Sequence, residues 1–285
     1  MNVADVMTPR ESVVTVEVPG TRDDALEYLK EGAFSSVPVI KRTEDGDGVR
    51  EHYRGLISRE RLIDRPDEDQ LALLAEEVRT TTAETSLVEL ARLMIEGSER
   101  RVPVVDDRLV GIVTVTDVVR AIADGDLATD ATVESVFAGA VNCVYAGTPL
   151  RVAERELSHA GDPYAIVLDD DAETAGMLTE VDVIDAARVV EGEADTGESI
   201  ANQDDEWAWE GIKAVGNRYT PTRNVELPDG RVSEFMTPDL VTLSKHRTVR
   251  EAAQLLLEQD IEQVPVVSGD RLVGLVQDMD LLKAV

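Results

Sequence analysis

Short apolar clusters alternate with polar stretches along the chain, and their order predicts a small mixed unit. The stretch from Thr242 to Val267 reads TLSKHRTVREAAQLLLEQDIEQVPVV. Apolar residues in it have the spacing of one buried helix face: Val249, Ala252, Ala253, Leu256 and Leu257. The block that begins at Val264 is too short for a helix and is bounded by turn residues, so it predicts a buried strand.

Three further stretches align with this one without a gap, which indicates an internal repeat. They begin at Thr15, Thr80 and Asn142. Each of the four has a hydroxyl residue where a helix N-cap belongs: Thr21, Ser86, Thr148 and Thr248. After a turn, each continues with an apolar run that opens with a glycine: Gly55, Gly111, Gly176 and Gly274. A short helical pattern follows, so the predicted order is β-α-β-β-α, four times.

These repeats predict an α/β (α+β) protein built from paired repeats. We expect the repeats at 1–66, 67–126, 127–192 and 231–285, with an acidic, tryptophan-containing insertion at 193–230. A unit of this size buries only part of its apolar surface alone, so pairing is expected. Repeats 1 and 2 would form one module, at about 1–126, and repeats 3 and 4 another, at about 127–285.

The charge of the chain adds a prediction about its surroundings. The hydrophobic content of 43% is too high for a disordered chain, but the net charge is −30, from 58 acidic and 28 basic residues. Such a chain repels itself in ordinary salt, whereas at molar salt the Debye length shrinks to about 3 Å. We therefore expect a halophilic protein; a moderately acidic mesophilic protein is the alternative. A polyanion is a poor partner for nucleic acid.

Several classes of site and location find no support in the sequence. Cys143 is the only cysteine, so no internal disulfide can form, and the three histidines do not cluster with it as metal ligands would. The sequence has no apolar run of the ~18–20 residues that cross a bilayer, and no signal peptide at its start. It has no Walker loop and no nucleophile elbow. We therefore expect a cytoplasmic protein with no membrane insertion, no metal and no catalytic activity.

A run of the form Gly-h-h-Ser/Thr-x-x-Asp is complete in two repeats, from Gly111 to Asp117 and from Gly176 to Asp182. Together with the Met-Thr-Pro openings at Met7 and Met236 and the Val-Pro-Val-Val strands, these residues resemble the CBS domain, whose pairs form Bateman modules. The resemblance covers most of the chain outside about 193–230. It implies binding of an adenosine-containing ligand in the cleft between paired repeats, with control of a partner protein as the output.

The resemblance also implies a role for each residue of this run. In the family the Asp hydrogen-bonds the ribose hydroxyls and the Ser or Thr lies near the phosphate, and both roles are chemically sound. Thr114 with Asp117 then gives one good site, and Thr179 with Asp182 a second. The fourth repeat keeps Asp280 but has Gln277 in place of the hydroxyl residue. The first repeat has Ser58 but Arg61 at the Asp position, which predicts no ribose recognition there.

The residues ahead of the second apolar block complete the candidate set. Arg100 and Arg101 stand where some family members direct basic side chains at phosphates, whereas Glu262 at the corresponding place in the fourth repeat would repel a phosphate. The candidate ligand-binding residues are therefore Thr80, Arg100, Arg101, Val102, Val104, Thr114, Asp117, Thr179, Asp182 and Asp280. An alternative stays open, because Asp and Thr at a helix start are also ordinary caps in a unit that binds nothing.

The expected function is regulatory. The ligand would be AMP, ADP, ATP or S-adenosylmethionine, with no obligatory cofactor, in a homodimer that controls an unidentified protein. A structural or assembly scaffold with vestigial clefts is the alternative. The insertion, with Trp207 and Trp209 beside Lys213, Arg218 and Arg223, is either a linker that packs its aromatics on a module or a lid or docking patch.

Overall fold

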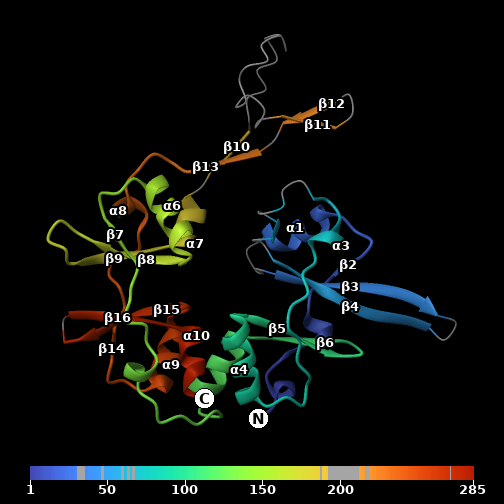
Figure 1. The fold of residues 1–285 in the computed structure, drawn as a ribbon, viewed down its shortest axis with the longest axis horizontal. Helices are drawn as coiled ribbons and strands as arrows, with labels where there is room; N and C mark the ends of the chain where they lie inside the picture. The colour runs from blue at the N-terminus through green and yellow to red at the C-terminus, as the bar shows by residue number, and fades with distance from the viewer. Residues whose placement is uncertain are drawn as a thin grey trace. The chain divides into compact units, whose positions relative to one another are not determined.

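The structure is a computed structural model that describes most of the chain. The described residues are 1–30, 36–45, 48–58, 61–62, 65, 68–186, 188–191, 212–215, 218–221, 223–269 and 271–285. They fall into two compact units (Figure 1). Unit 1 comprises Met1–Ala138 and Thr242–Val285, and unit 2 comprises Gly139–Val241. Each unit is described by itself.

The predicted order β-α-β-β-α is found in repeats 2 to 4, and the described residues of repeat 1 give its first four elements. The first has β2 (Val16–Glu17), α1 (Arg22–Lys30), β3 (Ser36–Asp45) and β4 (Gly48–Ser58). The second has α4 (Leu87–Gly97), β5 (Arg101–Asp106), β6 (Arg108–Thr114) and α5 (Val115–Asp124), with a bridge from Thr81 to Val104 as its first strand. The third has β7 (Cys143–Tyr145), α6 (Leu150–Ala160), β8 (Tyr164–Leu168), β9 (Thr174–Thr179) and α7 (Glu180–Ala186). The fourth has β14 (Leu243–Ser244), α9 (Val249–Gln259), β15 (Gln263–Ser268), β16 (Arg271–Gln277), α10 (Asp278–Leu281) and η4 (Leu282–Ala284).

Each repeat builds the same small sheet. The first strand runs parallel to the second, and the second forms an antiparallel hairpin with the third. The apolar residues of the central strand are buried in each repeat, such as Val37 and Val39 in β3 and Val102 and Val104 in β5. This arrangement brings the end of the third strand to the start of the second helix, where the candidate residues lie.

The helix caps confirm the alignment in two repeats and correct it in the third. Ser86 caps α4 by accepting from Glu89 N at 3.2 Å, and Thr248 caps α9 by accepting from Glu251 N at 3.1 Å. The prediction of Thr148 as a cap is wrong, because α6 begins after Pro149. The buried residues of α6 and α9 show the reason. Leu150, Ala153 and Leu157 take the places of Val249, Ala252 and Leu256, so the third repeat is offset by one residue from the gapless alignment.

A short segment precedes each repeat and packs on the other repeat of its pair. Each segment contains one helical turn: η1 (Val3–Asp5), α3 (Leu71–Leu74), η3 (Val133–Ser135) or α8 (Val232–Phe235). The segment before repeat 1 also contains β1 (Thr8–Pro9), which pairs with β6 of repeat 2. The other segments form bridges in the same manner: Gln70 and Glu76 to repeat 1, Thr132 and Ala138 to repeat 4, and Arg231 and Thr237 to repeat 3. The exchange pairs repeat 1 with 2 and repeat 3 with 4, as predicted.

The glycine that opens each apolar run is required by this exchange. A Cβ atom at Gly111 would lie 2.6 Å from Thr8 O, and one at Gly176 would lie 2.6 Å from Thr237 O. The same holds for Gly55 against Glu76 O at 2.5 Å and Gly274 against Ala138 O at 2.3 Å. Any side chain here would push the exchanged segment off the strand. In two of the repeats the glycine therefore contacts the threonine of a Met-Thr-Pro opening, Thr8 or Thr237.

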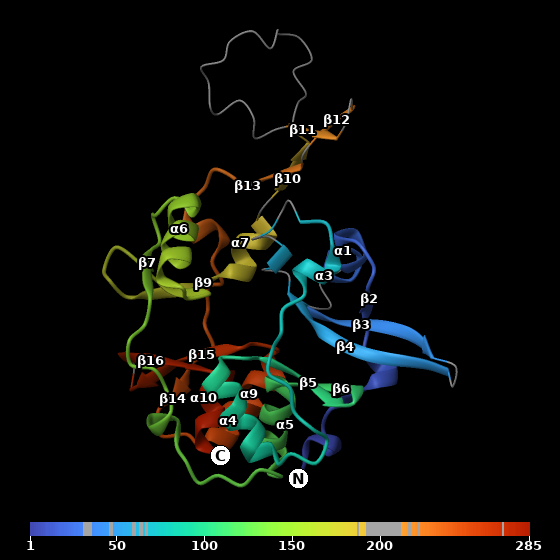
Figure 2. The same cartoon turned by 45° about the vertical axis from the view of Figure 1, so that its right-hand side comes forward.

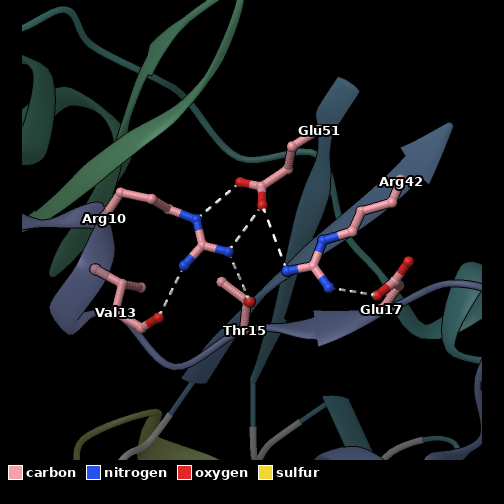
Figure 3. Close-up of polar contacts among 6 residues, drawn as sticks. All are labelled: Arg10, Val13, Thr15, Glu17, Arg42 and Glu51. Carbon is pink, nitrogen blue, oxygen red and sulfur yellow. Dashed lines mark hydrogen bonds and ion pairs between the residues drawn. The ribbon is translucent and has the colours of Figure 1, made fainter. Parts of the chain in front are cut away.

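The exchanged segment before repeat 1 returns to its own repeat through η2 (Arg10–Ser12). Figure 3 shows Arg10 donating through Nε and Nη2 to the two carboxylate oxygens of Glu51 on β4, at 2.8 and 2.9 Å. Arg10 also donates to Val13 O and Thr15 Oγ1, both at 3.1 Å. The hydrogen bond from Arg10 lowers the pKa of Glu51. This half-buried pair ties the crossing segment to the hairpin of repeat 1.

Unit 1 has a core that is shared by repeats 2 and 4. Figure 2 shows α4 and α5 beside α9 and α10. Val118, Val119 and Ile122 of repeat 2 belong to the same buried cluster as Ala253 and Leu256 of repeat 4. Repeat 1 and repeat 3 each have a core cluster of their own. The two compact units therefore do not coincide with the two exchanged pairs.

Small strands lie in the insertion and directly before it. β10 (Arg188–Glu191) pairs antiparallel with β13 (Arg223–Glu226), and β11 (Ile212–Val215) pairs antiparallel with β12 (Arg218–Pro221). Trp207 and Trp209 lie outside the described residues, so both interpretations of the insertion stay predictions. Within the described part of the chain, no helix combines the length and the apolar character that crossing a membrane needs.

Candidate functional site

The end of β6 and the start of α5 place Thr114 and Asp117 together. Thr114 is the N-cap of α5, and Asp117 stands at the third helical position. Asp117 Oδ2 accepts from the backbone N of Thr114 at 2.8 Å and from its Oγ1 at 2.8 Å. One carboxylate oxygen is thus used to cap the helix, as the capping alternative requires.

The second oxygen of Asp117 has more acceptor capacity left. Among the described residues, the partner of Oδ1 is Arg120 Nη1, at the long distance of 3.4 Å. The side chain of Asp117 is 14% exposed, so the carboxylate is not fully buried. A carboxylate in this state can still accept hydrogen bonds from a ligand that carries hydroxyl groups.

Repeat 3 has the same arrangement in unit 2. Asp182 Oδ2 accepts from Thr179 N at 2.8 Å and from Thr179 Oγ1 at 2.7 Å. Its Oδ1 lies 3.5 Å from the hydroxyl of Thr237, which belongs to the exchanged segment. Both complete runs therefore leave one carboxylate oxygen with a single long contact to the described residues.

In the two incomplete runs, the side chains at the Asp position form contacts with other residues of the protein. In repeat 4, Asp280 Oδ2 accepts from Gln277 N at 2.9 Å, and Oδ1 accepts from Lys283 Nζ at 2.6 Å. In repeat 1, Ser58 Oγ accepts from Arg61 N at 3.1 Å, and Arg61 Nη1 lies 3.1 Å from Glu76 Oε1. A ribose at Asp280 would have to displace a lysine, and Arg61 offers no acceptor.

Arg100 makes a contact that the sequence did not predict. It lies directly before β5, and its carbonyl oxygen accepts from Val115 N at 2.9 Å, which places it beside the start of α5. Its Nη1 and Nη2 donate to Asp278 Oδ1 and Oδ2 at 2.9 and 2.6 Å, and Nη2 lies 2.9 Å from Glu262 Oε1. Asp278 and Glu262 belong to repeat 4. Burial raises the pKa of Asp278, although Arg100 opposes that shift.

The sequence could not have identified Asp278 as the partner of Arg100. The two residues are 178 positions apart and lie in repeats that are not an exchanged pair. An acidic residue directly after the cap of α10 was the available signal, but acidic residues are common in the first turn of a helix. Next to this pair, a hollow of about 180 Å³ is lined by Thr116, Val119, Leu256, Leu257, Asp260, Ile261, Glu262 and Asp278.

The remaining candidates of repeat 2 lie around the same helix start. Arg101 is half-buried and stands opposite Thr114 in the hairpin. Val102 and Val104 are fully buried core residues. Thr80 is exposed and precedes Thr81, whose N donates to Pro103 O at 3.0 Å. The structure thus places Arg100, Arg101, Thr114 and Asp117 at the start of α5, while Thr179 and Asp182 lie in unit 2 and Asp280 is the third residue of α10. The ligand-binding roles of all ten residues stay predictions.

Comparison with known proteins decides the family. The model of the CBS domain matches four times, at residues 3–68, 72–124, 133–189 and 232–285. The chain belongs to the CBS domain family. Among the described residues of this CBS protein, no group of three or more His, Cys, Asp or Glu side chains could hold a metal ion.

Relatives of this CBS protein occur in archaea and plants. Uncharacterized protein MJ1404 of Methanocaldococcus jannaschii is 24% identical over 99% of this chain and 61% of its own length. The chloroplastic CBS domain-containing protein CBSX2 of Arabidopsis thaliana is 31% identical over 42% of this chain and 62% of its own length. The chain thus spans about three fifths of the length of these relatives. An uncharacterized conserved protein from Pyrococcus horikoshii has a solved structure with 26% identity, a TM-score of 0.68 and 99% coverage of both chains.

Proposed function

We propose that this CBS protein is a regulatory sensor of adenosine-containing ligands, such as AMP, ADP, ATP or S-adenosylmethionine. The main site is at Thr114 and Asp117, and a second is at Thr179 and Asp182. The protein catalyses no reaction and acts on a separate regulated protein. A cytoplasmic location and a homodimer belong to the same proposal.

The main support for the proposal is the state of the two carboxylate oxygens of Asp117. Asp117 uses Oδ2 for the helix cap, and among the described residues its Oδ1 has a single long contact of 3.4 Å, to Arg120. A carboxylate at such a strand-to-helix junction can accept from the two vicinal hydroxyls of a ribose. At the start of α5 the N–H of Val115 already donates to Arg100 O at 2.9 Å, so the phosphate of the same ligand would use the next N–H groups of the first turn.

The alternative, an assembly scaffold with vestigial clefts, also has an observation in its favour. Each complete run already satisfies a helix start by itself, since Thr114 and Asp117, or Thr179 and Asp182, form a full capping box. A repeat that binds nothing would need the same two residue types. The two functions differ in whether the chain binds adenosine compounds at all.

The test compares Asp117→Ala with Glu251→Ala. Glu251 accepts from Thr248 N at 2.8 Å and caps α9 as Asp117 caps α5, but it lies outside the run that carries the ligand. Binding of AMP, ATP and S-adenosylmethionine is measured by calorimetry in high salt. Asp117→Ala is expected to weaken binding at the main site by about tenfold or more, the loss of a charge-assisted hydrogen bond. Glu251→Ala should bind as the wild type does.

Two results would count against the sensor. A wild-type chain that binds none of the three compounds leaves the scaffold as the better account. Equal weakening by both variants would show that Asp117 acts through the stability of the helix start and not through the ligand.

A further inference from the structure

The ion pair between Arg100 and Asp278 links repeat 2 to repeat 4 inside unit 1. It is bidentate, with N–O distances of 2.9 and 2.6 Å, and the side chain of Asp278 is only 8% exposed. Asp278 also accepts from Met279 N at 2.7 Å through Oδ1. The fork of the guanidinium matches both carboxylate oxygens, which gives this pair a defined geometry that a single-contact ion pair lacks.

Arg100 is also a cation that lies directly beside the start of α5. Its carbonyl oxygen bonds the N–H of the first residue of that helix at 2.9 Å. A phosphate held at the same helix start lies within the span of an arginine side chain. The guanidinium fork binds phosphate as readily as it binds carboxylate. One cation therefore has two acceptors within reach, one in repeat 4 and one in the ligand.

Both acceptors cannot hold the same fork at once. When Arg100 turns to a phosphate, Asp278 is left buried without its partner, which is a costly state for a carboxylate. Glu262, whose side chain is 68% exposed, can be hydrated by solvent when Arg100 leaves it. Burial already raises the pKa of Asp278, so proton uptake offers that carboxylate a way to remain in place.

We propose that Asp278 is a specificity residue that competes with the ligand phosphate for Arg100. This inference rests on the proposed function and deepens it. Adenosine without a phosphate binds while the pair stays closed. A phosphate-bearing nucleotide opens the pair and so loosens the contact between repeats 2 and 4. The phosphate, and not the adenosine, then carries the signal between these repeats.

The test measures dissociation constants of AMP and adenosine for the full chain and for four variants. Asp278→Asn releases Arg100, so AMP is expected to bind about tenfold tighter while adenosine is unchanged. When Arg100 is already replaced by Gln, adding Asp278→Asn should give no gain in AMP affinity. The guanidinium for which the carboxylate and the phosphate compete is then absent. Glu134→Gln is the matched control. It also removes one acidic charge from unit 1, from the exposed pair with Lys245 at 2.6 Å, and should change neither constant.

The outcomes separate this inference from the proposed function. If wild type binds neither AMP nor adenosine, the proposed function fails. If both bind and Asp117→Ala weakens both, but Asp278→Asn leaves the ratio of the two constants at the wild-type value, only the inference fails. A gain that persists in the double variant would also overturn it, because a general charge effect would then explain the gain. Should Asp278→Asn not fold, Glu262→Gln must give a smaller gain for AMP alone, and no gain overturns the inference.

Discussion

At the scale of single residues, Arg10 and Glu51 hold together two parts of the chain that lie far apart in the sequence. The pair is half-buried, with side-chain exposures of 25% and 18%. Arg42 lies 3.9 Å from the same carboxylate and 3.1 Å from Glu17 (Figure 3). Because the Arg10 hydrogen bond lowers the pKa of Glu51, the ionised carboxylate favours the folded chain.

Glu51→Gln is expected to lower the free energy of unfolding by about 1–2 kcal/mol at neutral pH, since Arg10 loses its charged partner. The pKa of Glu51 is lowered in the folded chain, so its contribution is present above the ordinary glutamate pKa and disappears as the pH falls through the lowered value. The difference between variant and wild type should therefore shrink at acidic pH. Denaturant unfolding across a pH series measures it. Glu17→Gln, at a more exposed carboxylate, is the control and should cost less; a loss that is independent of pH would contradict the argument.

At the scale of elements, the exchanged segments decide how two repeats become a pair. Gly111 and Gly176 sit under carbonyl oxygens of those segments, where a Cβ atom would lie 2.6 Å away. Real Cβ atoms do not approach a carbonyl oxygen so closely, so a side chain must displace the segment or the strand. The glycines therefore belong to pairing, although they open a run that also carries the candidate ligand residues.

Gly111→Ala is expected to lower the free energy of unfolding by about 1–3 kcal/mol, the usual cost of overpacking a tight contact. Gly139→Ala is the matched control, because a Cβ atom there meets nothing within 4 Å. Denaturant unfolding of both variants under the same conditions makes the comparison. If the two variants lose the same stability, the close approach of Thr8 O to Gly111 is not what requires the glycine.

The sequence was informative about elements and weaker about their partners. The repeated order of strands and helices, and the caps Ser86 and Thr248, follow from local patterns and were predicted. The Thr148 cap failed because a gapless alignment cannot see an offset of one residue, whereas the buried face of α6 fixes it. The exchange of segments and the partner of Arg100 depend on contacts between distant parts of the chain. No local periodicity reports such contacts.

The candidate site divides in the same way. Thr114 and Asp117 could be predicted because their spacing is that of a helix cap and of the family run. The sequence could not show that one oxygen of Asp117 caps α5 while the other has only a long contact of 3.4 Å to Arg120. Nor could it show that Lys283 forms an ion pair with Asp280 and donates to its second oxygen, Oδ1. These differences between two similar aspartates arise from their neighbours in the fold, Arg120 and Lys283.

At the scale of the whole molecule, charge repulsion is the dominant electrostatic term. The net charge of −30 acts on every part of the chain, and the described ion pairs offset only some of it. Self-repulsion of this kind weakens a compact state unless counterions screen it. The halophilic origin predicted from composition is therefore a statement about stability that can be measured.

Raising potassium chloride from about 0.1 M to about 2 M is expected to raise the midpoint of thermal unfolding by roughly 10 °C or more, because the screening length falls from about 10 Å to a few ångströms. Sorbitol at equal osmolality is the control, since it excludes volume without screening charge. Circular dichroism during heating measures both series. A midpoint that is unchanged by salt, or that rises equally in sorbitol, would favour the moderately acidic mesophilic alternative.

The crossing of segments also bears on how such a chain can be duplicated in evolution. A copy of residues 1–66 would carry away the strand that completes repeat 2 and would leave behind residues 70–76, which complete repeat 1. A copy that reaches residue 126 contains both. Gene duplication can therefore add repeats of this kind two at a time and keep every sheet complete. The gain or loss of a single repeat would leave one glycine-bearing strand without its covering segment, and one segment without a strand to pair with.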